Sequence, residues 1–150
     1  ALNGAPTIGT LDGANVEIRE HVGAENFFLF GLTAHEVIER RKVHDFSRTA
    51  INESPRLARV LHNIADGMFS PGDPGRYHGL VTLMYENDYF LVTADFDDYY
   101  ETQRKVDAAY ADPKAWAEMA ALNTARSGWF SSDRTISGYA KDIWNTPSLL

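Results

Sequence analysis

Residues 6–31 constrain the fold most, because two short apolar segments there flank a stretch of helical character. Residues 6–10 carry β-branched side chains and lead into the turn Gly9-Thr10-Leu11-Asp12-Gly13. This pattern predicts a buried strand, a sharp turn, and a helix over residues 13–22 that Thr10 or Asp12 caps. Residues 26–31 contain the run Phe-Phe-Leu-Phe, typical of a strand buried on both faces. We therefore predict two parallel strands joined by a right-handed crossover helix.

A third element follows, because Thr33 and Glu36 have the spacing of a capping box ahead of a helix over residues 34–41. Residues 1–41 are thus predicted to form a βαβα unit, the end of a Rossmann-like, doubly wound parallel sheet. Two strands are marginal on their own. We expect either neighbouring strands in upstream sequence or a second copy of the chain to cover the sheet.

Residues 54–150 are predicted to be mostly helical, which makes the fold class α/β. Ser54 has the character of an N-cap, and Pro55 suits the first position of the helix that follows. Asp95 with Asp98 is predicted to start a long helix that reaches Tyr110. Asp112 and Ser132 are expected to cap the last two helices. Residues 71–75 are predicted to be a loop, whereas residues 89–92 fit either a short strand or an extended connection.

The composition is that of a globular chain, with 150 residues, 44% hydrophobic residues and a net charge of -7. This length fits one domain, and the negative charge argues against nucleic acid or an anionic membrane as a partner. The sequence has no cysteine, which excludes disulfides and fits a reducing cytoplasm. No apolar run approaches the length of a membrane span, so we expect a cytoplasmic protein with no membrane partner.

An acidic cluster, Asp95, Asp97 and Asp98, could bind a cation or form the Asp-x-Asp signature of some nucleotide-sugar transferases. The spacing favours a helix N-terminus, where carboxylates meet backbone amides and the helix dipole. Histidines with zinc-site spacing are missing, which favours structural or solvated roles for all of them. The histidines are His21, His35, His44, His62 and His78.

Other familiar site motifs do not occur. The sequence has no nucleophile elbow or Walker loop, and the glycine turn lacks a complete dinucleotide fingerprint. Ser131-Ser132-Asp133-Arg134 could gather around a phosphate, but we favour a capped helix whose arginine pairs with a carboxylate. Several aromatic side chains could stack on sugar rings, although their helical spacing favours the core. They are Trp116, Trp129, Phe130, Tyr139 and Trp144.

Four blocks resemble the glycogen and maltodextrin phosphorylases in order and spacing. They cover residues 2–18, 23–31, 94–96 and 122–136. The first contains Thr7-Ile8-Gly9-Thr10-Leu11-Asp12-Gly13-Ala14-Asn15-Val16-Glu17, similar to the segment after the family's cofactor lysine. The last contains Ser131-Ser132-Asp133-Arg134-Thr135-Ile136. Pro6 departs from the family, which usually has another apolar residue there, and residues 42–76 do not align.

The resemblance implies the C-terminal part of a GT-B type fold in a bacterial-type α-1,4-glucan phosphorylase, a glycosyltransferase. Such enzymes use inorganic phosphate to release glucose 1-phosphate from glycogen or maltodextrin. Their pyridoxal phosphate forms a Schiff base with a lysine that the resemblance places two residues before Ala1. Lys42, Lys105, Lys114 and Lys141 match no such motif. The resemblance thus implies no catalytic, cofactor-binding or metal-binding residue here, and we predict that the 150 residues alone are inactive and bind no pyridoxal phosphate.

Because the chain begins at Ala1 within a strand-like pattern, we expect residues 1–150 to be a single partial domain, a fragment or processed form. Its role would be to complete the cofactor domain, with the late helices packing back across it. We expect the parent enzyme to act on α-1,4-glucan and phosphate and to form a homo-oligomer. The alternative is a non-catalytic helical binding or scaffold module with a sugar or protein partner.

Overall fold

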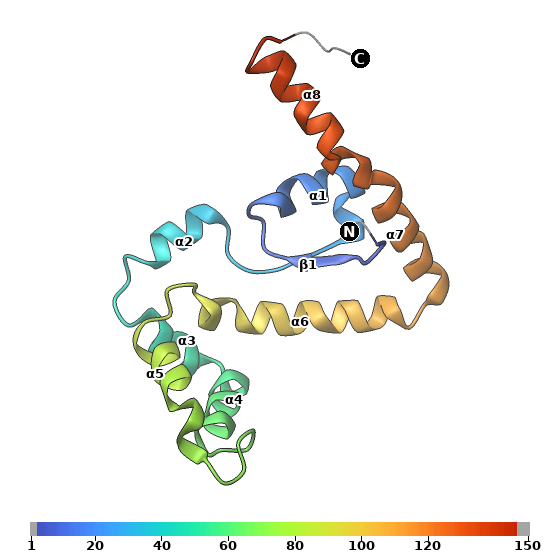
Figure 1. Cartoon of the computed structure of the whole chain (residues 1–150). Coiled ribbons are helices and arrows are strands. Elements are labelled where there is room, and N and C mark those ends of the chain that lie inside the picture. Colours follow the sequence, from blue (N-terminus) through green and yellow to red (C-terminus); the bar gives the residue numbers. More distant parts are fainter. Residues whose placement is uncertain (1–2, 147–150) are drawn as a thin grey trace.

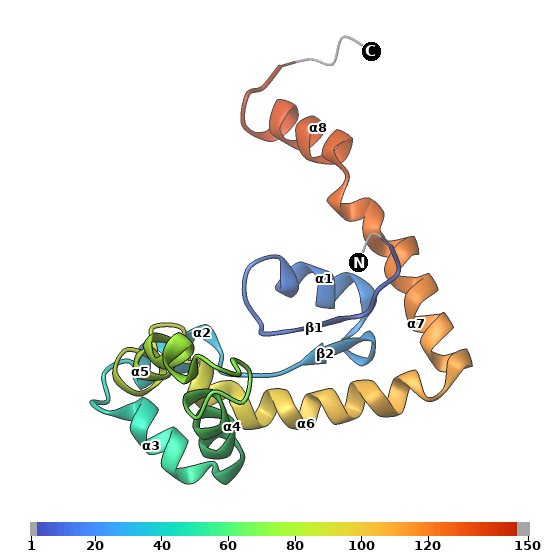
Figure 2. The same ribbon diagram turned by 60° about the horizontal axis from the view of Figure 1, so that its bottom comes forward.

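The computed structural model describes residues 3–146, in which a small parallel sheet lies between two helices (Figure 1). Strand β1 (Thr7–Gly9) pairs in parallel with β2 (Phe27–Leu29), so that Thr7 lies opposite Phe27. Helix α1 (Ala14–Val22) and the short 3-10 helix η1 (Ala24–Asn26) connect the strands. Figure 2 shows α1 on one side of the sheet and α6 (Val92–Tyr110) on the other. The predicted parallel pair is confirmed, with shorter strands than expected.

The start of α1 differs from the prediction. Gly13 is the N-cap, with φ of 52° and no side-chain cap. The carboxylate of Asp12 accepts a hydrogen bond from the backbone amide of Gly13 at 2.7 Å. The expected cap by Thr10 or Asp12 is therefore wrong, because the left-handed turn at Gly13 leaves Asp12 bonded to the amide next to it.

Four helices follow the sheet: α2 (Ala34–Arg40), α3 (Phe46–Glu53), α4 (Pro55–Ala65) and α5 (His78–Glu86), the last preceded by the 3-10 helix η2 (Pro74–Tyr77). The capping box of Thr33 and Glu36 is confirmed. Ser54 caps α4 by accepting from the backbone amide of Leu57 at 3.1 Å, as predicted. Helix α3 lies in a stretch for which no element was predicted. Its Ile51 packs with Leu57 and Leu61 of α4 in a buried hydrophobic core.

The predicted long helix is confirmed as α6 and ends at Tyr110 as expected, but it begins at Val92, three residues before the predicted start at Asp95. Its first amides are bound by Asp88, whose carboxylate accepts from the amides of Val92 and Thr93 at 3.0 and 2.7 Å. Residues 89–92 therefore form no strand: residues 89–91 are the turn after Asp88, and Val92 is the first residue of α6.

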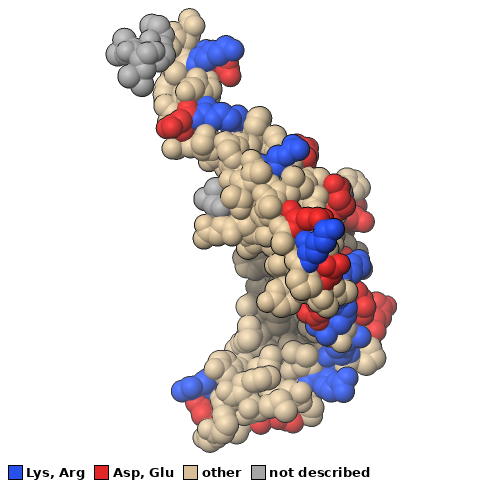
Figure 3. Space-filling model, turned by 90° about the vertical axis from the view of Figure 1, so that its right-hand side faces the viewer, with Lys and Arg blue, Asp and Glu red and all other residues tan. Residues whose placement is uncertain are grey.

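The C-terminal part consists of α7 (Pro113–Arg126), the 3-10 helix η3 (Ser127–Phe130) and α8 (Ser132–Asp142). Asp112 caps α7 as predicted. Ser131, and not Ser132, caps α8, because Ser132 is already the first helical residue. Helix α8 projects from the rest of the chain (Figure 1), and its Ile136 is exposed. The molecule is curved, and charged side chains gather mainly along its convex side in Figure 3.

Helices account for most of the described chain and accompany a short two-stranded parallel sheet, as the predicted α/β class requires. Among these residues, no helix has both the length and the apolar character needed to span a membrane.

Candidate functional site

A crevice lies at the carboxyl ends of the two parallel strands, where ligands bind in open α/β sheets. Thr10 directly follows β1, and Phe30 directly follows β2. The cavity has a volume of about 390 Å³, and we call it the strand-end crevice. Its walls are Thr10, Phe30, Phe90, Val92, Asp95, Phe96 and Tyr99. Phe30 and Tyr99 meet edge to face, with ring centroids 5.1 Å apart.

The acidic cluster of α6 borders this crevice and binds backbone amides. Asp98 accepts a hydrogen bond from the amide of Gly31 at 2.7 Å, and Asp95 accepts one from Leu32 at 2.9 Å. The side chain of Asp97 instead lies 3.4 Å from the guanidinium of Arg56. The expected role at the N-terminus of their own helix is wrong, because Asp95 and Asp98 reach across to the loop after β2.

Burial raises the pKa of Asp95 above its ordinary value, and the negative charges of Asp98, Asp88 and Glu36 act in the same direction. The hydrogen bond from the amide of Leu32 opposes this shift. Within residues 3–146, no group of three or more histidine or acidic side chains is arranged to hold a metal ion.

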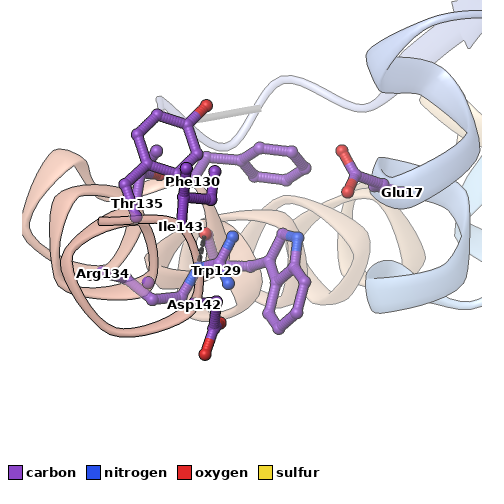
Figure 4. A pocket seen from close by; sticks show the side chains of 9 residues that line it. Glu17, Trp129, Phe130, Arg134, Thr135, Asp142 and Ile143 are labelled. Carbon is purple, nitrogen blue, oxygen red and sulfur yellow. Dashed lines mark hydrogen bonds between the residues drawn. The ribbon is translucent and has the colours of Figure 1, made fainter. Parts of the chain in front are cut away.

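A second cavity, the C-terminal pocket, lies between α1, η3 and α8 (Figure 4) and has a volume of about 500 Å³. Its lining is Glu17, Trp129, Phe130, Arg134, Thr135, Gly138, Tyr139, Asp142 and Ile143. The guanidinium of Arg134 lies 3.7 Å from the centroid of the Trp129 ring, and its Nε donates to the Trp129 carbonyl. Arg134 thus packs on Trp129 and takes no carboxylate partner among the described residues, contrary to the prediction.

The aromatic side chains proposed for sugar stacking have mixed positions. The ring of His21 lies 4.3 Å from that of Trp129, and Arg134 packs on it too, so Trp129 serves packing. Trp116 packs edge to face with Tyr110 at 5.1 Å. Trp144 and Tyr139 are 55% and 45% exposed, so the core assignment of these two side chains is wrong for the described chain.

The histidines have the structural or solvated roles that were predicted. His62 lies 3.0 Å from Asp66 on the surface, and His78 is 3.2 Å from the Ala65 carbonyl. His35 and His44 are exposed. The lysines are exposed as well, and neither the strand-end crevice nor the C-terminal pocket is lined by a lysine.

Three polar residues have structural roles that were not predicted from the sequence. Asp88 is buried and binds the first two amides of α6 from three positions before the N-cap residue, Leu91, so the N-cap preference for aspartate does not identify it. Arg56 lies 3.6 Å from the centroid of the Tyr100 ring, and Asn123 is 1% exposed with its amide nitrogen bonded to Met119. The contact of Arg56 depends on a tertiary neighbour that no local pattern specifies, whereas the hydrogen bond of Asn123 lies within α7.

Residues 1–146 match the model of the family described as carbohydrate phosphorylase. The chain belongs to this family. It is 51% identical over 145 residues to a glycogen phosphorylase of Synechocystis sp.. That alignment covers 96% of this chain and 17% of the relative. It is 43% identical over 143 residues to the muscle form of human glycogen phosphorylase, covering 95% of this chain and 17% of that protein.

The alignment with a plant relative covers a similar share of both chains. The chain is 50% identical over 151 aligned residues to the H isozyme of alpha-glucan phosphorylase from Solanum tuberosum, covering 97% of this chain and 17% of the relative. The phosphorylase chain described here thus spans about one sixth of the length of these relatives.

Proposed function

We propose that this chain is the C-terminal part of an α-1,4-glucan phosphorylase with a GT-B type fold, and that it works in the cytoplasm. The complete enzyme would use inorganic phosphate to release glucose 1-phosphate from glycogen or maltodextrin. The observation that carries this proposal is a family match over residues 1–146 together with relatives that are about six times longer. The role of these residues would be to complete the domain that holds the cofactor.

The two-stranded sheet supports the interpretation that these residues are part of a domain and not a whole one. Parallel sheets of α/β proteins normally have both faces covered by helices and contain more than two strands. Here the only strands of the described residues are β1 and β2. Further strands from the same enzyme would extend this sheet.

Pyridoxal phosphate would be the cofactor of the complete enzyme, where a Schiff-base lysine holds it. The residues described here do not fit as that site, because their lysines are exposed and line neither cavity. We derive no reaction step from this chain, and we propose that the cofactor lysine belongs to the rest of the enzyme.

Two measurements test the proposed function. The complete enzyme should release glucose 1-phosphate from maltodextrin in the presence of phosphate, whereas the 150 residues alone should not. Incubation of each with pyridoxal phosphate, borohydride reduction and peptide mapping should label one lysine of the complete enzyme and none of this chain. Stoichiometric labelling and phosphorolysis by the 150 residues alone would contradict the proposal.

The alternative, a non-catalytic helical module, has no supporting observation, since the relatives compared above are all named as phosphorylases. A gene that encodes only these residues would favour the non-catalytic module over the phosphorylase.

A further inference from the structure

The chain exposes more surface than a compact protein of its mass. Its accessible surface is 10330 Å² for 16.8 kDa, whereas a compact monomer of that mass exposes about 7,600 Å². Even fully extended, the six terminal residues outside the described range would account for only about 1,000 Å² of the difference. The chain therefore exposes well over 1,000 Å² more surface than a compact monomer of its mass.

The strand-end crevice has mostly apolar walls. Three phenylalanines and a valine form most of its wall: Phe30, Phe90, Phe96 and Val92. Phe90 is 78% exposed, the largest exposed fraction among the large hydrophobic side chains of the described chain. Exposed apolar surface of this kind occurs at interfaces with other polypeptides and in ligand-binding grooves.

The polar groups of the crevice do not suit a small polar ligand. A small-molecule site combines apolar walls with a few convergent polar groups that orient the ligand. The acid in this wall, Asp95, already accepts a hydrogen bond from the amide of Leu32. Its neighbour Asp98 is likewise bound to the amide of Gly31. An apolar side chain from a polypeptide fits the walls better than a sugar or a phosphate does.

We propose that the strand-end crevice receives an apolar side chain from the remaining part of the same phosphorylase polypeptide. This inference rests on the proposed function, because it needs a complete enzyme longer than this chain. A second copy of the chain is the less suitable occupant. One partner of a standard interface covers about 800 Å², and the excess surface here is about twice that or more. The relatives, about six times longer, supply polypeptide enough to cover it.

A photo-crosslinking experiment on the complete enzyme tests the proposal. p-Benzoylphenylalanine replaces Phe90, and after irradiation the cross-linked peptides are identified by mass spectrometry and the chains are separated on a denaturing gel. The matched control carries the same photoprobe in place of Lys114, whose side chain is 88% exposed and lies at the start of α7.

We expect the probe at position 90 to cross-link within one chain, to a residue outside this 150-residue segment, with at least ten times the yield of the control probe. Cross-links between two chains would overturn the proposal in favour of a second copy. A yield at position 90 equal to that of the control would overturn it in favour of a solvent-exposed crevice. If the enzyme shows phosphorolysis in either case, the proposed function survives while this inference fails.

Discussion

The carboxylate of Asp98 accepts a hydrogen bond from the backbone amide of Gly31 at 2.7 Å, across 67 positions of sequence. One turn earlier on the same face of α6, Asp95 accepts from the amide of Leu32. Gly31 has φ of 80°, and a Cβ atom there would lie 2.8 Å from the Asp95 carboxylate. Glycine therefore allows α6 to hold the loop that follows β2.

Replacement of Asp98 by alanine should lower the free energy of unfolding by about 1.5 kcal/mol, because the amide of Gly31 loses a charged acceptor. The Asp97→Ala variant is the matched control, since Asp97 forms only an exposed ion pair with Arg56. That variant should change stability by less than about 1 kcal/mol. Urea unfolding measures both, and equal effects would contradict a special role for Asp98.

The raised pKa of Asp95 predicts a pH dependence of stability. An unfolded aspartate titrates near pH 4, at about 3.9, whereas burial raises the folded pKa of Asp95 above this value. Between these two pKa values the folded state binds more protons than the unfolded state, so stability falls as pH rises through the window.

The Asp95→Asn variant removes this titration while keeping an oxygen acceptor for the amide of Leu32. The free energy of unfolding of the variant, minus that of the unmodified chain, should be larger at pH 7 than at pH 3.5. Urea unfolding at both pH values gives the comparison, and a difference that does not change with pH would show that Asp95 titrates normally.

The Ser131→Ala variant should destabilise α8, because the Ser131 hydroxyl accepts from the amide of Arg134 at 3.2 Å. Loss of such a cap costs about 1 kcal/mol. Ser132→Ala should have little effect, since Ser132 lies inside the helix. Hydrogen exchange of the α8 amides distinguishes the two, and faster exchange only in Ser132→Ala would reverse the assignment of the cap.

Gly4 packs against α7, where a Cβ atom would lie 3.0 Å from the Ala120 carbonyl oxygen and from Thr124 Oγ1. Its φ of 78° adds a cost of about 1–2 kcal/mol for any other residue. The Gly4→Ala variant should therefore lose more than about 1 kcal/mol. Gly128→Ala, with no atom within 4 Å of the added carbon, should not destabilise the chain, as thermal unfolding can check.

The isolated chain should self-associate. The run of apolar residues in and after β2 is not the cause, because Phe27 is buried and Phe28, Leu29 and Phe30 are half-buried. The side chains of Phe90 and Ile143 are exposed. Burying them against a second copy of the chain lowers the free energy, which favours association. Light scattering at several concentrations measures this, and a 16.8 kDa species throughout would contradict it.

Local structure could be predicted from the sequence where hydrogen bonds join residues two to four positions apart. The caps at Thr33, Ser54 and Asp112 are of this kind. The parallel strand pair was predictable as well, because the run Phe-Phe-Leu-Phe and the helix before it leave few topologies. The family was also recognisable from the first and last sequence blocks.

The sequence by itself thus determined most of the helices, the strand pairing and the family, but not α3. Tertiary structure alone decided that Asp95 and Asp98 bind the loop after β2 and that Phe30 and Phe90 border one crevice. The physical reason is the separation of the partners. A capping bond is set by the spacing within one turn, whereas contacts between positions more than 60 residues apart depend on how α6 packs against the sheet.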